Sequence, residues 1–175
     1  MPLTLHEAFV PPANQVLTAL RGLVDKAEAH CAETGCTADT LIDAKLAEDM
    51  WNLPWHVRSC WVHSGYAINL FKTGTFSPDF TDIPGDWDAM RAQIDDALAQ
   101  LDAITPDDLE ALADKPVDFV LGGQTLMTMT GQNFLLSFTQ PNLFFHATTF
   151  YDILRMQGVA LGKRDYLGNP RIMGT

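Results

Sequence analysis

Apolar residues recur at three- and four-residue spacing along four long stretches of the chain, a pattern typical of helices that bury one face. In the first stretch, for example, Leu17, Leu20 and Val24 fall on one stripe. Because four such helices can bury their stripes against one another, the pattern predicts an all-α four-helix bundle. The predicted helices run from about Leu3 or Pro12 to Cys31, and over about Leu53–Phe71, Asp86–Leu101 and Gln132–Met156.

A different pattern lies between the third and fourth predicted helices. Val117, Phe119 and Leu121 alternate with their neighbours, as residues of a β-strand do, and the pair Gly122-Gly123 separates this run from a second one. Two runs joined by a two-residue glycine turn predict a β-hairpin. We therefore expect a small hairpin over about residues 116–130, before the last helix of the bundle.

Proline and glycine positions predict where the helices bend or end. Pro11-Pro12 is expected to start or kink the first helix, and Pro141 to kink or split the last one, because proline lacks the amide hydrogen that a helix needs. Gly158 suits the end of the last helix, so residues 159–175 are predicted to form an extended tail on the bundle. Segment 73–84, with two prolines and a glycine, is predicted to be irregular.

Composition and charge narrow the class of protein. The chain has 175 residues, of which 47% are hydrophobic, which predicts one domain over residues 1–175 with a real core. Its net charge of −11 argues against nucleic acid or an anionic membrane as a partner. No stretch approaches the roughly 20 apolar residues of a membrane span. Without a basic region before an apolar run at the N-terminus, we predict a cytoplasmic protein.

The three cysteines support the same compartment. Cys31, Cys36 and Cys60 are an odd number, which fits a reducing environment better than a disulfide framework. Cys31 and Cys36 are close enough in sequence for a disulfide or a shared metal. We favour the simpler interpretation, in which both are free thiols at a helix end and in the loop after it.

One block near the C-terminus carries a resemblance to a known family. It runs from Phe144 to Gly168 and joins His146 to Arg155, Gly158 and a basic segment. With the Gly122-Gly123 hairpin, it makes the chain resemble the DinB/YfiT-like superfamily of four-helix bundles, whose members include metalloenzymes, and within it a bacterial family of domains of unknown function. The resemblance covers nearly the whole chain and implies up-down-down-up helix connections.

The resemblance also implies a metal site, which this sequence matches only in part. Relatives that bind Ni²⁺ or Zn²⁺ use one histidine of the second helix and two of the last, four residues apart. His146 keeps the family's spacing to the arginine and glycine that follow, but Asn142 stands where the first histidine of that pair belongs. The second-helix ligand falls at His56 or His63. The implied divalent-metal ligands are therefore His56, His63 and His146.

Helix geometry alone points to the same part of the bundle. Asn142 and His146 lie on one face of the last helix, while His56, Cys60 and His63 share one stripe of the second. If these faces meet, imidazole and thiol groups converge, and such groups suit Zn²⁺, Ni²⁺ or copper. We therefore expect a ligand pocket between the two helices, lined by Trp55, Cys60, Asn142, His146 and Arg155.

Each of these residues also has a purely structural explanation. A histidine among phenylalanines is commonly a hydrogen-bonded core residue. Cys60 is either a nucleophile activated by a neighbouring histidine or a buried thiol. Asn142 can bond backbone groups that Pro141 leaves free, and Arg155 can hold an anionic substrate or neutralise the C-terminal end of its helix.

Three functions stay open on the sequence alone. The first is a pocket for a small molecule, or a degenerate metal site at His146. The second, implied by the resemblance, is a metal- or thiol-dependent transferase or isomerase. The third is a non-catalytic structural or stress-related module that forms a homodimer through exposed aromatic residues. The chain has no G-x-G-x-x-G, P-loop or H-E-x-x-H motif, which gives no support to nucleotide binding or zinc proteolysis.

Overall fold

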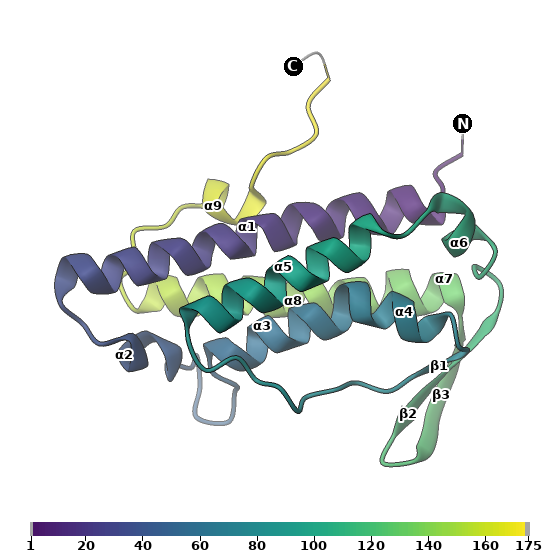
Figure 1. Ribbon diagram of the computed structural model, residues 1–175, viewed down its shortest axis with the longest axis horizontal. Helices are drawn as coiled ribbons and strands as arrows, with labels where there is room; N and C mark the ends of the chain where they lie inside the picture. The colour runs from purple at the N-terminus through teal and green to yellow at the C-terminus, as the bar shows by residue number, and fades with distance from the viewer. Residues whose placement is uncertain (1, 174–175) are drawn as a thin grey trace.

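Four long helical segments pack side by side in a computed structural model that describes residues 2–173 (Figure 1). The second segment joins α3, the π-helical η1 and α4, and runs in the same direction as the third (Figure 1). The first and last segments run the opposite way, so the connections are up-down-down-up and the predicted bundle is confirmed. The segments are α1 Leu5–Thr34, α3 Leu53–Trp61 with η1 Val62–Tyr66 and α4 Ala67–Phe71, α5 Trp87–Asp102, and α8 Gln140–Met156.

The first helix begins at a side-chain cap and ends at a glycine. The Thr4 hydroxyl accepts a hydrogen bond from the Glu7 amide at 3.1 Å, and Gly35 ends the helix with φ 75°. The pair Pro11-Pro12 lies inside α1 and does not start it, contrary to one of the two expectations. Gln140 of the last helix donates to the Ala8 carbonyl, the group that the missing amide hydrogen of the second proline leaves free.

The apolar spacing of the second helical segment had suggested a regular α-helix, but the segment is not α-helical throughout. It passes through η1, where His63 and Ser64 have non-helical backbone angles. Gly65 lies so close to α5 that a Cβ placed on it would be 2.4 Å from the Gln100 Cβ. The wider π-turn therefore occurs where this helix crosses its neighbour, next to a histidine of the predicted site.

The last helix continues through Pro141 and is not split there. A short α7, Gly131–Asn133, leads into the π-helical η2, Phe134–Thr139, and then into α8. The wide π-turns come immediately before the proline, where they leave room for a residue without an amide hydrogen. Asn142 donates to the Phe138 carbonyl at 2.7 Å, so its side chain turns back onto its own helix.

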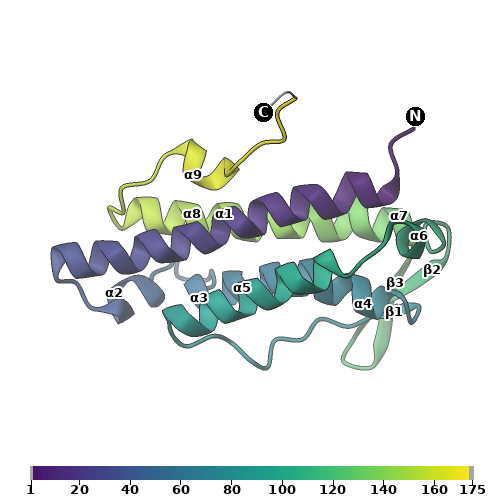
Figure 2. The same cartoon turned by 45° about the horizontal axis from the view of Figure 1, so that its top comes forward.

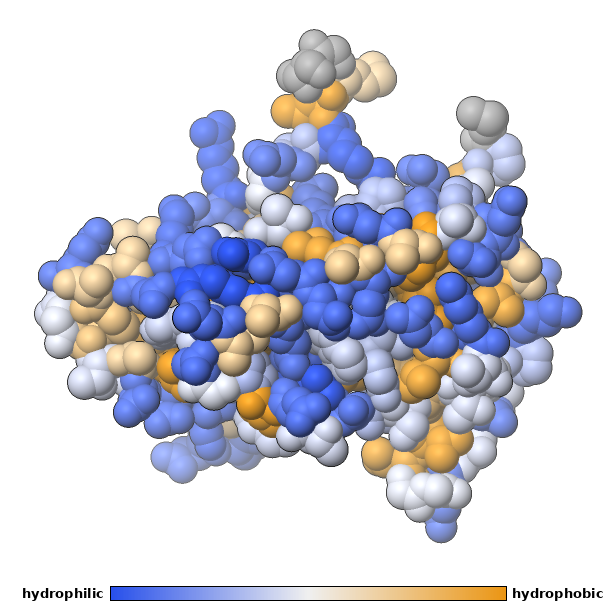
Figure 3. All heavy atoms as spheres, viewed as in Figure 1, coloured by the Kyte–Doolittle hydropathy of each residue, from blue (hydrophilic) through white to orange (hydrophobic). Residues whose placement is uncertain are grey.

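The predicted hairpin is present and forms part of a three-stranded sheet. Strand β2, Pro116–Leu121, pairs antiparallel with β3, Gln124–Thr130, around Gly122 and Gly123, whose φ angles are 58° and 78°. Strand β1, Thr75–Phe76, pairs parallel with β2, so the segment expected to be irregular contributes a strand. The hairpin extends away from the bundle, and its surface carries apolar side chains (Figure 3).

Three short helices complete the fold: α2 Ala38–Ile42, α6 Pro106–Glu110 and α9 Lys163–Leu167. The last one corrects the prediction of a wholly extended tail, of which residues 174–175 lie outside the described part. It rests along α1 (Figure 2), where the Asp165 carboxylate accepts from the Lys26 ammonium at 2.6 Å. Among residues 2–173, no helix combines the length and apolar character needed to cross a membrane.

Candidate functional site

Three histidines from two helical segments meet in the interior of the bundle. His56 lies in α3, His63 in η1 and His146 in α8, and each is at most 8% exposed. The Nδ1 atoms of His56 and His146 are 3.0 Å apart, and the rings of His63 and His146 stack at 6.2 Å between centroids with planes 8° apart. The two faces that helix spacing had placed together therefore do meet.

Hydrogen bonding fixes which nitrogen of His56 and of His146 carries the proton. His56 Nε2 lies 3.1 Å from the Trp51 carbonyl, which only accepts, so this nitrogen carries a hydrogen. A neutral His56 then offers Nδ1 as an acceptor, and His146 must donate to it from its own Nδ1. The remaining nitrogen, His146 Nε2, is left as a bare lone pair.

Burial keeps all three rings neutral at ordinary pH. Desolvation lowers the pKa of His56 and of His63 to about 4. It lowers the pKa of His146 to about 3, with further unfavourable interactions from the other two rings. The site therefore presents hydrogen-bond acceptors and potential metal ligands that protons do not block, but no strong base.

Three ring nitrogens of the cluster have no hydrogen-bond partner among the described residues. Neither nitrogen of His63 makes a hydrogen bond, and its Nδ1 is fully buried. His146 Nε2 also makes no hydrogen bond within residues 2–173, but it is not fully buried. Because buried polar groups in folded proteins are almost always bonded, these atoms are the ones that a ligand would satisfy.

A cleft of about 240 Å³ opens beside His146. Trp51 stacks on the His146 ring at 5.8 Å between centroids, and Phe145, 54% exposed, lies at the mouth. A larger depression of about 470 Å³ adjoins it along α8 and shares two of its lining residues. The cleft itself is lined by Asp49, Met50, Trp51, His56, Phe145 and His146.

A buried arginine holds in place the loop that packs behind Trp51. Arg58 is 4% exposed and binds Asp79 through its side chain at 3.2 Å and its carbonyl at 2.8 Å. This anchors the loop before α5, so that Phe80 packs against the rings of Trp51 and Trp55. Phe80 therefore supports Trp51 from a loop that the Arg58 guanidinium ties to α3.

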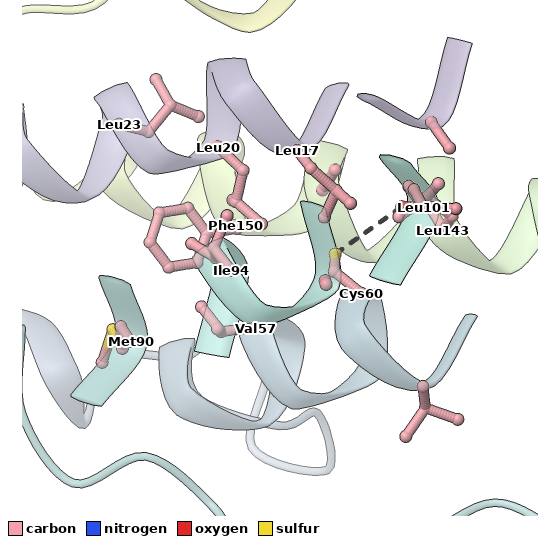
Figure 4. Packing of buried hydrophobic residues seen from close by; sticks show 14 of the residues in the cluster. Leu17, Leu20, Leu23, Val57, Cys60, Met90, Ile94, Leu101, Leu143 and Phe150 are labelled. Carbon is pink, nitrogen blue, oxygen red and sulfur yellow. Dashed lines mark hydrogen bonds between the residues drawn. The ribbon is translucent and has the colours of Figure 1, made fainter. Parts of the chain in front are cut away.

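Of the five residues predicted to line the pocket, the structure places only His146 in the cleft. Trp55 stacks behind Trp51 at 5.0 Å between centroids. Cys60 is fully buried in the core beside Leu143, whose carbonyl lies 3.8 Å from its sulfur (Figure 4). Asn142 bonds its own helix, and Arg155 donates to the Leu161 carbonyl at the far end of α8.

Burial also decides between the two roles suggested for Cys60. Desolvation raises the pKa of its thiol far above the usual range, so the thiolate that a nucleophile requires is not formed. The side chain instead packs as a small apolar group among leucines of three helices (Figure 4).

Sequence reasoning missed half of the residues that line the cleft. Asp49 and Met50 come from the loop before α3. Trp51, a tryptophan that the sequence offered as a pocket residue, comes from the same loop and acts on His56 through a backbone carbonyl, which no side-chain pattern reveals. Phe145 was visible only as one of several phenylalanines in the last helix. Its exposure at the protein surface is the signal that sets it apart, and only the fold supplies that signal.

The three histidines match a metal site only in part. Two nitrogens bound to one tetrahedral zinc lie roughly 3.3 Å apart, and the Nδ1 atoms of His56 and His146 are already 3.0 Å apart. Metal-binding histidines are also commonly oriented by a bond from the other ring nitrogen to a carbonyl, as His56 Nε2 is by the Trp51 carbonyl. However, within residues 2–173 no group of three His, Cys, Asp or Glu side chains is placed to hold an ion without rearrangement.

Comparison with known proteins agrees with this architecture and names no activity. The family model described as "Domain of unknown function (DUF1993)" matches residues 5–167. The crystal structure of a DinB family member protein from Shewanella denitrificans is similar, with 27% identity, a TM-score of 0.79, and coverage of 98% of this chain and 96% of that one. The DinB-like resemblance seen in the sequence is thereby confirmed. No curated protein matches the chain.

Proposed function

Because the chain belongs to the DUF1993 family of domains of unknown function, we propose its function from the site alone: it binds a small molecule in the cleft beside His146. The observation that carries this proposal is the unpartnered lone pair of His146 Nε2 at the edge of an apolar cleft. A ligand that donates a hydrogen bond there satisfies a nearly buried polar atom, which is worth more than the same bond at the surface.

The cleft walls specify the rest of the ligand. Trp51 and Phe145 provide aromatic surface, and Met50 provides a flexible apolar contact. The Asp49 carboxylate is the charged group at the cleft. A small molecule with an apolar or flat body and an N–H, O–H or S–H donor fits this set, and an anionic ligand would meet a carboxylate at the entrance.

The transferase or isomerase alternative depends on a metal. A thiol has a pKa of about 8.5 in water, whereas that of His146 is about 3. The imidazole therefore cannot remove the thiol proton to any useful extent, although it can accept a hydrogen bond from it. Without a metal to stabilise a thiolate, the site favours binding over thiol-dependent catalysis.

The experiment that tests small-molecule binding uses the thermal unfolding of the purified chain. Low-molecular-weight thiols, amides and phenols are screened, and a ligand at 100 times its dissociation constant adds about 2.7 kcal/mol to the free energy of unfolding. We expect at least one compound to raise the melting temperature of the wild type and of His30→Ala, but not that of His146→Phe. His30 lies on α1, outside the cleft. An equal shift in all three proteins would overturn the proposal.

A second candidate function, binding of a divalent metal, is favoured by the orphaned His63 Nδ1. If the proton on His146 Nδ1 moves to Nε2, the Nδ1 atoms of His56 and His146 both offer lone pairs to the point between them. Rotation of the His63 ring, which stacks on His146, then brings a third imidazole to the same point. Ni²⁺ or Zn²⁺ bound there by His56, His63 and His146 would polarise a ligand or hold a thiolate.

Metal binding is tested by titrating the protein with Co²⁺, whose visible absorption reports its coordination, and then with Zn²⁺ as a competitor. We expect one equivalent to bind, and His63→Ala and His146→Ala each to weaken binding at least about tenfold, as loss of a coordination partner does. The matched control His30→Ala should bind like the wild type. Binding that is equally weak in all four proteins would exclude a site built from these histidines.

A further inference from the structure

Two thiols lie side by side at the C-terminal end of α1, outside the cleft and unused by the proposed function. Cys31 is in the last turn of the helix and Cys36 follows it, and their Sγ atoms are 2.7 Å apart. Both are free thiols. Since a disulfide bond is about 2.05 Å long, the two sulfur atoms need to approach each other by less than about 1 Å to form one.

The backbone between the two cysteines explains this contact. Gly35 ends α1 in the left-handed conformation, with φ 75°, and its amide donates to the Cys31 carbonyl at 2.9 Å. This turn brings the residue after Gly35 back over the last turn of the helix. The Thr37 carbonyl lies 3.6 Å from the Cys31 sulfur, which adds a second contact that holds the turn closed.

The two thiols differ in exposure and in acidity. Cys31 is 8% exposed, and burial together with its neighbour raises its pKa to about 11. Cys36 is only half-buried, and hydrogen bonds with Cys31 and Thr34 lower its pKa below the usual value for a thiol. Because the thiolate is the nucleophile, Cys36 is the sulfur that reacts first with a reagent from solution.

We propose that Cys31 and Cys36 form a redox-active dithiol that closes to an internal disulfide on reaction with a low-molecular-weight disulfide. The Cys36 thiolate attacks one sulfur of the reagent, forms a mixed disulfide and releases one thiolate. Cys31 then loses its proton to water and attacks the Cys36 sulfur, which releases the second thiolate. Two protein thiols are thereby oxidised to one disulfide, and the reagent is reduced to two thiols.

The third cysteine provides a natural internal control. Cys60 is fully buried in the core, and its thiol pKa is raised far above the usual range. It should therefore remain a free thiol under conditions that close the dithiol. Retention of the Cys60 thiol also shows that the protein has stayed folded during the reaction.

The test treats the full chain with oxidised glutathione, alkylates the remaining thiols and identifies them by peptide mass spectrometry. We expect the wild type to keep one free thiol, at Cys60, and to lose two hydrogen atoms without retaining glutathione. Cys31→Ala should instead hold glutathione stably on Cys36, because no resolving thiol is present, and Cys36→Ser should not react. Glutathione that stays on Cys36 in the wild type, or three unreacted thiols, would overturn the proposal.

A rate measurement keeps the test independent of any loss of stability in the variants. In the native wild type, Cys36 is the more exposed of the two thiols, and its pKa is lowered while that of Cys31 is raised, so Cys36 holds the larger share of thiolate. We therefore expect iodoacetamide to label Cys36 at least about tenfold faster than Cys31. Equal rates at the two positions would contradict the assigned order of attack.

Discussion

His63 has a ring nitrogen that is buried without a partner, next to two further neutral histidines. Each ring has a folded-state pKa well below the value of about 6.5 that it has in an unfolded chain. Below pH 6.5 the unfolded chain therefore binds protons that the folded protein does not. The folded state loses stability over this range because the charged form of each ring is excluded from the core.

We predict that the free energy of unfolding falls as the pH is lowered from about 6.5 towards about 4, by up to about 1.4 kcal/mol per pH unit for each histidine that stays neutral. Urea unfolding at pH 7, 6 and 5 measures this slope. Replacing His63 by Phe removes one such group, so the slope should decrease. The same slope in the variant and the wild type would mean that His63 takes up a proton in the folded protein.

Three carboxylates with shifted pKa values do not account for the loss of stability that begins near pH 6.5. The pKa values of Asp79, Asp108 and Asp165 are lowered in the folded state by hydrogen bonds and nearby cations. Their contribution to stability is therefore present above about pH 4 and is lost only at lower pH. Loss of stability between pH 6.5 and about 5 therefore reports the buried histidines rather than these three carboxylates.

Two glycines in helical segments differ completely in their surroundings. A Cβ on Gly65, in η1, would lie 2.4 Å from the Gln100 Cβ and 3.0 Å from the Ala97 carbonyl, so this segment packs directly on α5. A Cβ on Gly22, in the middle of α1, would meet nothing within 4 Å. Replacing each glycine by alanine therefore separates the effect of packing on stability from the effect of helix propensity.

We predict that Gly65→Ala destabilises the protein by about 1–3 kcal/mol, because it forces η1 and α5 apart. Gly22→Ala should stabilise it by about 0.5–1 kcal/mol, because alanine favours a helix interior. Chemical denaturation of both variants beside the wild type gives the two values. A stable Gly65→Ala variant would show that the π-turn can shift to make room.

The elements that the sequence predicted are those with local signals. The helices follow from apolar spacing, and the hairpin follows from Gly122-Gly123. Strand β1 and the two π-helical stretches depend on partners far along the chain, such as α5 opposite Gly65 and β2 beside Thr75. No local pattern contains that information.

The same distinction applies to the site. Helix spacing correctly placed His56 and His63 opposite His146, since positions on one face can be counted along a sequence. It did not identify Asp49 and Met50, because irregular segments have no period to count. Whether the histidines bind a ligand or a metal stays a prediction.

Charge is distributed very unevenly over the whole molecule. The chain carries −11 in total, yet between Lys115 and Asp152 the only charged residue is Asp118. The exposed apolar residues of the hairpin, Leu121, Leu126 and Met127, fall within this stretch. Two copies of the chain repel each other over most of their surface, and this hairpin is where that repulsion is weakest.

We predict that the protein forms a homodimer through the hairpin, as an uncharged edge strand favours pairing with another copy of itself. Sedimentation equilibrium should give a mass near twice 19.3 kDa. Leu126→Lys should shift the equilibrium to the monomer, whereas the same change at Leu3, which is exposed outside the hairpin, should not. A wild type that is monomeric at micromolar concentration would count against this interface.

The up-down-down-up connections have a consequence for the order of events during synthesis. The first helix packs against the last one, and α3 also packs against α8, so both must wait for residues near the end of the chain. Contacts between such distant segments close slowly. The nascent protein therefore carries the apolar face of α3 without its main partner until α8 has left the ribosome, whereas α1 can already pack against α5, so α3 is the segment that a chaperone would protect longest.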